Sequence, residues 1–132
     1  QQDIEAALQF MRAQASVDAS RIGIVGASYG SSNAIIYAAT DPEIKAVALL
    51  SPGLNYFNEL PTEESVRAYA GRPLLAVASS EDLRSVETVE AYRELAPAMQ
   101  SEMYRDAGHG TDILDAGVGL GGEILAFLKK NL

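Results

Sequence analysis

Apolar runs alternate with amphipathic segments along most of the chain. The runs rich in β-branched and small apolar residues have the length of buried strands. Four strands are predicted in this way, at residues 21–25, 46–50, 73–78 and 102–105. Five helices are predicted, three of them from apolar residues at helical spacing and that at 31–40 from its helix-forming composition. These cover residues 3–14, 31–40, 63–69, 85–95 and 123–130.

In three of these helices, apolar side chains recur every three or four residues and therefore share one face. We expect these faces to be buried. The side chains concerned are Ile4, Leu8 and Met11 in the first helix, Val86, Val89 and Tyr92 in the fourth, and Ile124, Leu125 and Leu128 in the last.

The alternation of strands and helices predicts the fold class. Strands joined through helices pair in parallel, and right-handed crossovers place the helices on both faces of the sheet. We therefore expect an α/β fold with a three-layer arrangement, a parallel sheet flanked by helices, formed by residues 1–132 as a single domain. Ligands bind such folds at the carboxyl ends of the strands.

Composition narrows the classes of function. Ten lysines and arginines against eighteen aspartates and glutamates give a net charge of −8, which disfavours nucleic-acid binding because phosphates are repelled. No apolar run approaches the roughly 20 residues of a membrane span, so no membrane association is expected. With one histidine, no cysteine and scattered carboxylates, we expect neither a metal nor another cofactor. Because the chain has no cysteine, any nucleophile must be an oxygen.

A serine lies in a glycine-flanked turn between the first strand and the second helix. Residues 26–30 read Gly-Ala-Ser-Tyr-Gly and match Gly-x-Ser-x-Gly, in the strand–turn–helix setting that this motif requires. Such a turn presents Ser28 as a nucleophile at strained backbone angles, and we expect both flanking glycines to be needed to avoid the following helix. The backbone N–H of Tyr29 would face the oxyanion that forms on the substrate.

Two further polar residues follow strands at the same edge of the predicted sheet. His109, the only histidine, lies in a glycine-flanked loop after the fourth strand and is suited to act as a general base toward Ser28. Asp82 follows the third strand and is placed to orient His109. Glu81 is the nearest competitor for this acid role. Asp106 is a poorer candidate, because it lies only three residues before His109 and would struggle to reach the far nitrogen of the imidazole.

Simpler interpretations of these residues stay open. Gly23, Gly26 and Gly30 loosely imitate a dinucleotide fingerprint, which would make the turn a nucleotide-binding loop. His109 is otherwise a surface-loop histidine. Asp82 is otherwise a turn or helix-capping residue, because aspartate favours such positions.

The loop after the second strand supplies candidate substrate contacts. It reads Ser-Pro-Gly-Leu-Asn-Tyr-Phe over residues 51–57 and follows a strand at the predicted ligand edge. We expect the mouth of the substrate pocket to be lined by Ser51, Pro52, Asn55 and Tyr56.

At these residues the sequence resembles the α/β-hydrolase superfamily, and within it the bacterial dienelactone-hydrolase-like serine esterases. Residues 50–56, 72–77 and 104–111 add to the resemblance, and the chain order serine, acid, histidine is that of the superfamily. The resemblance implies a Ser28–Asp82–His109 triad that cleaves carboxylic esters, thioesters or lactones through an acyl-enzyme. Dienelactone hydrolases themselves use a cysteine nucleophile, so Ser28 indicates an esterase-like relative.

The resemblance also implies strands ahead of the serine turn, so the chain is interpreted as the C-terminal half of the fold. The loop that supplies the second oxyanion N–H belongs to the other half, and losing one such donor typically costs about 100- to 1000-fold in turnover. The strand at 21–25 would then be an apolar edge. We expect this strand to pair with the same strand of a second copy in a homodimer, or with an N-terminal half of the fold. A catalytically impaired, self-associating scaffold is the alternative function.

Overall fold

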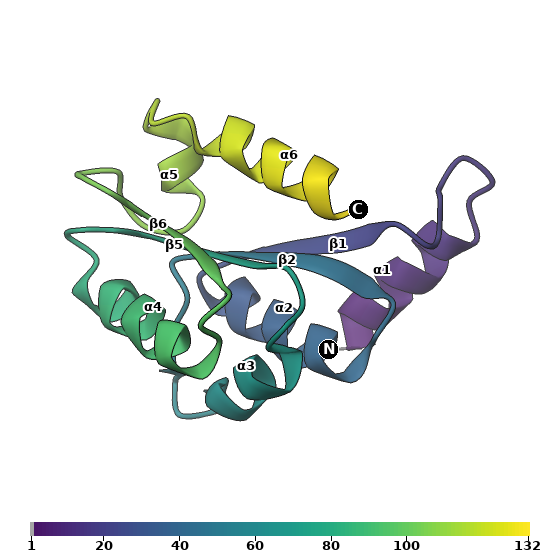
Figure 1. Ribbon diagram of the computed structural model, residues 1–132, viewed down its shortest axis with the longest axis horizontal. Coiled ribbons are helices and arrows are strands. Elements are labelled where there is room, and N and C mark those ends of the chain that lie inside the picture. Colours follow the sequence, from purple (N-terminus) through teal and green to yellow (C-terminus); the bar gives the residue numbers. More distant parts are fainter. Residues whose placement is uncertain (1) are drawn as a thin grey trace.

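The computed structural model describes residues 2–132 and centres on a four-stranded parallel sheet (Figure 1). Its strand order is β1-β2-β5-β6. The four strands are β1 (Ile22–Ala27), β2 (Ile44–Leu50), β5 (Leu74–Ser79) and β6 (Gln100–Tyr104). Each of the four predicted strands is therefore present, displaced by at most two residues at its ends. The parallel α/β fold predicted from the sequence is confirmed.

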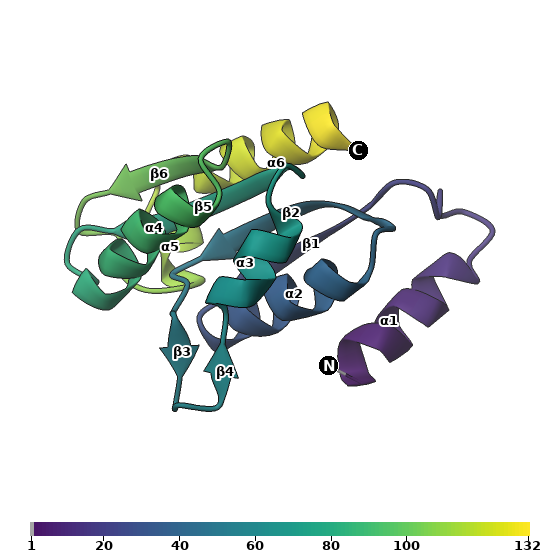
Figure 2. The ribbon, with the colours of Figure 1, turned by 60° about the horizontal axis from the view of Figure 1, so that its bottom comes forward.

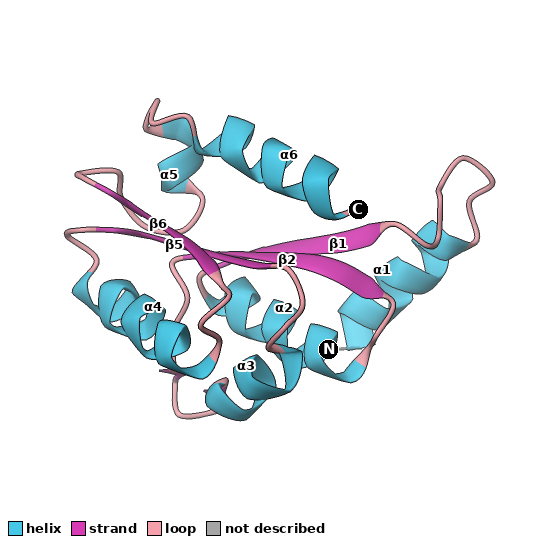
Figure 3. Cartoon of the chain, viewed as in Figure 1, coloured by secondary structure: helices cyan, strands magenta, loops and turns pink. Residues whose placement is uncertain are grey.

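Helices cover both faces of this sheet (Figure 3). One face carries four of them, namely α1 (Gln2–Arg12), α2 (Tyr29–Thr40), α3 (Glu63–Tyr69) and α4 (Leu83–Leu95). The other face carries the short α5 (Asp112–Asp115) and α6 (Leu120–Asn131). The central strands β2 and β5 are buried along nearly their whole length because both of their faces are covered.

Two large apolar clusters, and a small third one of Ala76, Ala78 and Val89, fill the spaces between the layers. On the α2–α4 side, Ile35, Leu49 and Tyr92 are fully buried in one cluster. On the α6 side, Val77 and Ile113 belong to the other cluster. Side chains from neighbouring positions of one strand point to opposite faces, so alternate residues of β2 and β5 contribute to different clusters.

The buried faces of two helices differ from the prediction. In α6, Leu125 was expected to be buried but is 52% exposed, because the helix turns Leu120, Ile124 and Phe127 toward the sheet. In α1, only Leu8 is buried and Met11 is 44% exposed. This helix lies beside the outer strand β1, where there is less surface to cover one of its faces (Figure 2).

Two small elements were not predicted. The strands β3 (Asn55–Tyr56) and β4 (Leu60–Pro61) form a short antiparallel hairpin that projects away from the sheet, past α3 (Figure 2). The side chain of Asn55 accepts the N–H of Leu60 at 2.9 Å and helps to close it. The single turn of α5 lies in the loop after His109. Both elements are too short to produce a periodic pattern in the sequence.

Strand β1 is the outer strand of the sheet on the α1 side, as the sequence predicted for residues 21–25. Its residue Val25 is 46% exposed. Among residues 2–132, no helix is long and apolar enough to cross a membrane.

Candidate active site

Ser28 is the single residue between the end of β1 and the start of α2. Its backbone angles, φ 53° and ψ −125°, lie in a region that residues with side chains rarely adopt, so this turn is strained. The N–H of Ser28 donates to the carbonyl of Leu50 at 2.8 Å, and its own carbonyl accepts the N–H of Ser31 at 2.9 Å. These bonds hold the strained turn to β2 and to the first turn of α2.

The two glycines of the motif have different roles. A Cβ atom at Gly26 would lie 2.5 Å from the carbonyl oxygen of Gly30 and 2.8 Å from the Cβ atom of Ala34, so no side chain fits there. A Cβ atom at Gly30 would meet nothing within 4 Å. The expectation that both glycines are needed to avoid the helix is therefore wrong for Gly30, which faces open space.

Ser28, His109 and Asp82 form a continuous hydrogen-bonded series at the carboxyl end of the sheet. The Nε2 atom of His109 lies 2.7 Å from the Oγ atom of Ser28, and its Nδ1 atom lies 2.6 Å from the Oδ2 atom of Asp82. These residues come from the exits of three different strands, β1, β5 and β6. The sheet thus brings together residues that are up to 81 positions apart in the chain.

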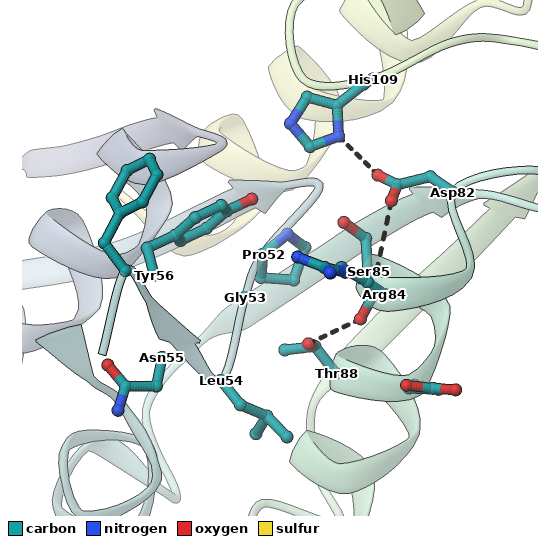
Figure 4. Close-up of a pocket in the computed structure, with 12 residues that line it drawn as sticks. Pro52, Gly53, Leu54, Asn55, Tyr56, Asp82, Arg84, Ser85, Thr88 and His109 are labelled. Carbon is teal, nitrogen blue, oxygen red and sulfur yellow. Dashed lines mark hydrogen bonds and ion pairs between the residues drawn. The ribbon is translucent and has the colours of Figure 1, made fainter. Parts of the chain in front are cut away.

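Asp82 combines the two interpretations that its sequence position left open. It is the N-cap residue of α4, where its Oδ1 atom accepts the N–H of Ser85 at 3.4 Å. Its other oxygen contacts His109 (Figure 4). Partial burial raises the pKa of Asp82, but hydrogen bonds from Ser85 and His109 outweigh this, and the pKa lies below its ordinary value. The carboxylate therefore stays ionised near neutral pH.

The charge of Asp82 selects the tautomer of His109. An ionised carboxylate only accepts hydrogen bonds, so the proton of a neutral imidazole resides on Nδ1. The Nε2 atom is then free to accept the hydroxyl proton of Ser28. This is the arrangement that general-base activation of a hydroxyl requires.

Tyr29 begins α2, directly after the strained turn. Its backbone N–H belongs to the first helical turn, whose donors have no carbonyl four residues earlier to bond with. Its ring lies near two other aromatic rings, with centroids 6.2 Å from that of Tyr56 and 5.9 Å from that of Phe57. The rings of Tyr29, Tyr56 and Phe57 lie together next to Ser28, and we refer to these three residues as the aromatic cluster.

A pocket of about 450 Å³ lies between the β3–β4 hairpin and the first turns of α4 (Figure 4). His109 and Asp82 are at one end of it. Its lining includes three of the four residues expected at the pocket mouth, Pro52, Asn55 and Tyr56. The hydroxyl of Tyr56 also reaches the site, donating to the carbonyl of Ser51 at 3.0 Å and lying 3.4 Å from Oγ of Ser28.

Ser51 is not on this lining, contrary to expectation. It is fully buried, with a positive φ of 48°, and its hydroxyl accepts the N–H of Gly110 at 2.8 Å. The strained backbone turns its side chain inward, beneath the loop that carries His109. Phe57 and Arg84 also line the pocket and were not expected there from the sequence. Their positions, next to Tyr56 and two residues after Asp82, were the available signals.

The alternative interpretation of the glycines finds little support in the geometry. Gly23 lies inside β1, where an added Cβ atom would be 3.0 Å from the carbonyl oxygen of Ala46, so it packs a strand and does not line the turn. The three glycines therefore do not form one phosphate-binding loop. Within residues 2–132, no group of three or more histidine, cysteine, aspartate or glutamate side chains could hold a metal ion.

The model of one protein family, the dienelactone hydrolase family, matches residues 1–112, a segment that contains Ser28, Asp82 and His109. The chain belongs to the dienelactone hydrolase family. Among curated proteins, no match to the sequence is found. This family membership confirms the resemblance that the sequence motifs indicated.

Solved structures of hydrolases share the fold of this dienelactone hydrolase family member. A dienelactone hydrolase from Anabaena variabilis is 19% identical, with a TM-score of 0.73 over 94% of this chain and 55% of that one. An esterase domain of a Rhodothermus marinus protein is 24% identical, with a TM-score of 0.72 over 98% of this chain and 67% of that one.

The Pyrococcus furiosus esterase Pf2001 is 20% identical, with a TM-score of 0.74 over 98% of this chain and 60% of that one. At these identities the likeness establishes the α/β-hydrolase fold alone. The chain spans between 55% and 67% of the length of these three structures.

Proposed function

We propose that this protein is a serine hydrolase that cleaves carboxylic esters, with Ser28 as the nucleophile, His109 as the general base and Asp82 as the residue that orients it. The observation that carries the proposal is the unbroken series Ser28 Oγ, His109 Nε2, His109 Nδ1, Asp82 Oδ2, with contacts of 2.7 and 2.6 Å. Membership of a hydrolase family supports the reaction class. The strained backbone at Ser28 supports a functional role for the turn.

The proposed reaction has two halves. In the first, Oγ of Ser28 attacks the ester carbonyl while Nε2 of His109 takes the hydroxyl proton. The tetrahedral intermediate then expels the alcohol, which leaves with that proton, and Ser28 carries the acyl group. In the second half, water gives a proton to His109 and attacks the acyl-enzyme. The carboxylic acid is released and Ser28 recovers its proton.

The start of α2 is suited to stabilise the oxyanion in both halves. The N–H of Tyr29 follows Ser28 directly, and the N-terminus of a helix carries partial positive charge. A donor that faces the developing oxyanion contributes about 100- to 1000-fold to turnover. Tyr29 would act here through its backbone, whereas its ring belongs to the aromatic cluster.

The pocket suggests the class of ester. Its volume of about 450 Å³ suits a small acyl or alcohol group. Pro52, Leu54, Tyr56 and Phe57 supply apolar lining near His109, while Asn55, Arg84 and Glu87 supply polar groups. We propose small esters with an apolar group as substrates, and thioesters or lactones with the same carbonyl chemistry remain within reach of this mechanism.

A fluorophosphonate probe tests the proposal directly, since it reacts with activated serines. We expect the probe to modify the wild-type protein at Ser28, located by peptide mass spectrometry, and to leave Ser28→Ala unmodified. Hydrolysis of p-nitrophenyl acetate should be lost in the same variant. A wild-type protein that neither reacts with the probe nor hydrolyses short esters would contradict the proposal.

A second candidate function is a self-associating module, and one observation favours it. Strand β1 is an outer strand with Val25 exposed, and unpaired strand edges readily add another strand. We propose that two copies of the chain pair through β1 to form one continuous sheet. Light scattering should then give a dimer mass, and Val25→Lys should shift it to the monomer mass. A monomer at all concentrations would reject this pairing.

A further inference from the structure

The loop that carries His109 is held by side chains at the exit of β5. The N–H groups of Asp106 and Gly108 donate to the two carboxylate oxygens of Glu81, at 3.0 and 2.6 Å. Between them, the N–H of Ala107 donates to the hydroxyl oxygen of Ser79 at 2.9 Å. That hydroxyl in turn donates to Glu81 at 2.5 Å. Three consecutive backbone donors thus end on one carboxylate, two directly and one through Ser79.

The backbone of this loop is shaped to bind an anion. Asp106 and Gly108 have positive φ values of 51° and 85°, which turns successive N–H groups toward the same side. Such concave arrangements of backbone N–H groups bind phosphates and carboxylates in many proteins. Here the anion is the side chain of Glu81. The hydrogen bonds from Ser79 and Gly108 lower the pKa of Glu81 to about 2, so it is a carboxylate at neutral pH.

A second contact holds the other end of the loop. Gly110 donates its N–H to the buried hydroxyl of Ser51 at the exit of β2. His109 is therefore flanked by anchored backbone on both sides. Within residues 2–132 its ring hydrogen-bonds with Ser28 and Asp82 alone, so the position of the ring over the sheet also depends on this backbone.

Glu81 and Asp82 divide the work between them. Both residues follow β5. The carboxylate oxygens of Asp82 bond with His109 and with the first turn of α4. The carboxylate oxygens of Glu81 accept hydrogen bonds from the loop backbone and from Ser79. Both oxygens of Glu81 thus have partners, and the imidazole bonds to Asp82 instead. The sequence alone had left both residues as candidates for the acid.

We propose that Glu81 is a positioning residue of the proposed ester hydrolysis, which holds the backbone of residues 106–108 so that Nε2 of His109 stays within hydrogen-bonding distance of Oγ of Ser28. This inference rests on the proposed function. A misplacement of about 1 Å in a reacting group can cost about 100-fold in rate. Loss of the Glu81 contacts should therefore reduce kcat without changing how the pocket binds the ester.

The test compares Glu81→Gln with Glu90→Gln, which removes the same charge from an exposed site on α4. A glutamine at position 81 keeps one acceptor oxygen but turns an NH₂ group toward a backbone N–H, so the loop loses at least one contact. We expect kcat for p-nitrophenyl acetate to fall about 10- to 100-fold in Glu81→Gln with KM changed less than about threefold. Glu90→Gln should match the wild type in both constants.

The single histidine provides a readout that does not depend on turnover. In the ¹H NMR spectrum, the far-downfield Nδ1–H signal belongs to His109 without further assignment, because the chain has one histidine and no tryptophan. We expect the Nδ1–H signal to broaden or shift in Glu81→Gln, and the amides of residues 106–108 to exchange faster with solvent. A merely stabilising role would lower the unfolding midpoint and leave these signals unchanged in the folded protein.

The outcomes separate this inference from the proposed function. An unaltered His109 signal and unaltered amide exchange in a folded Glu81→Gln protein would overturn the positioning role, even if Ser28 proves to be the nucleophile. Conversely, the wild-type protein could be inactive while its His109 signal still changes in Glu81→Gln. That result would refute the hydrolase function and support Glu81 as the residue that holds the backbone of residues 106–108 in position. If Glu81→Gln does not fold, Ser79→Ala removes the bridging contact and should give the same changes more weakly.

Discussion

Asp82 contacts His109 with one carboxylate oxygen, at 2.6 Å, while its other oxygen caps the first turn of α4. The imidazole is therefore held in place by a residue at the start of a helix that packs on the sheet, and not only by another loop. A carboxylate held in this way cannot rotate away without uncapping α4. The relationship makes the two functions of Asp82 separable by mutation.

Asp82→Asn should lower kcat for ester hydrolysis by roughly 1,000- to 10,000-fold, because an amide in place of the carboxylate favours the wrong tautomer of the histidine. The unfolding midpoint should change little, since asparagine is as good an N-cap as aspartate. Asp82→Ala should lose the same activity and also about 1 kcal/mol of stability. Steady-state kinetics and urea denaturation measure the two effects. Equal stability of the two variants would show that the cap contributes nothing.

Gly26 and Gly30 should respond differently to the same substitution. Gly26→Ala places a methyl group 2.5 Å from the carbonyl oxygen of Gly30, so we expect a loss of about 1–3 kcal/mol in the free energy of unfolding. Gly30→Ala points into open space within α2 and should be neutral or stabilising by up to about 1 kcal/mol, since alanine favours helices. Urea denaturation of both variants provides the comparison. A destabilised Gly30→Ala protein would contradict it.

The aromatic cluster should influence substrate choice. Phe57 is 77% exposed at the tip of the hairpin, so removing its ring should barely change stability. Phe57→Ala should reduce kcat/KM for p-nitrophenyl benzoate about 2- to 10-fold relative to p-nitrophenyl acetate, because stacking of an aromatic acyl group is lost. Phe10→Ala, which removes a similarly exposed ring from α1, serves as the control. A ratio that does not change in Phe57→Ala would exclude the cluster from acyl recognition.

Glu81 should make the stability of the protein depend on acidity. Its pKa falls from an ordinary 4.5 to about 2 in the folded state, mainly because of the hydrogen bond from Ser79 and then that from Gly108. A depressed pKa stabilises the folded state above the unfolded value and loses that effect as the pH falls. The difference in unfolding free energy between wild type and Glu81→Gln should thus be constant above about pH 5 and shrink between pH 4.5 and 2. Urea denaturation across this range tests it, and a difference that persists at pH 2 would argue against an ionised Glu81.

The main strands and most helices could be predicted because their signals are local. β1, β2 and β5 contain apolar runs over most of their length, and α3 was predicted at its observed bounds, Glu63–Tyr69. The hairpin of β3 and β4 could not be predicted, because two-residue strands exist only through their pairing with each other. Leu125 illustrates the same limit, since helical spacing allows two overlapping faces and only the position of the sheet decides which one is buried.

In the candidate site too, local signals could be predicted from the sequence, whereas features set by tertiary contacts could not. The turn motif and the lone histidine identify Ser28 and His109 from the sequence by itself, and the exit of β5 narrows the acid to Asp82 with Glu81 as its competitor, because residue type and strand-exit position are local properties. Only the tertiary structure decided that Asp82 and not Glu81 contacts the imidazole, and that Ser51 lies beneath the loop and not on the pocket. The reason is physical: backbone φ values and the register of neighbouring strands set where a side chain points, and both depend on contacts between distant parts of the chain.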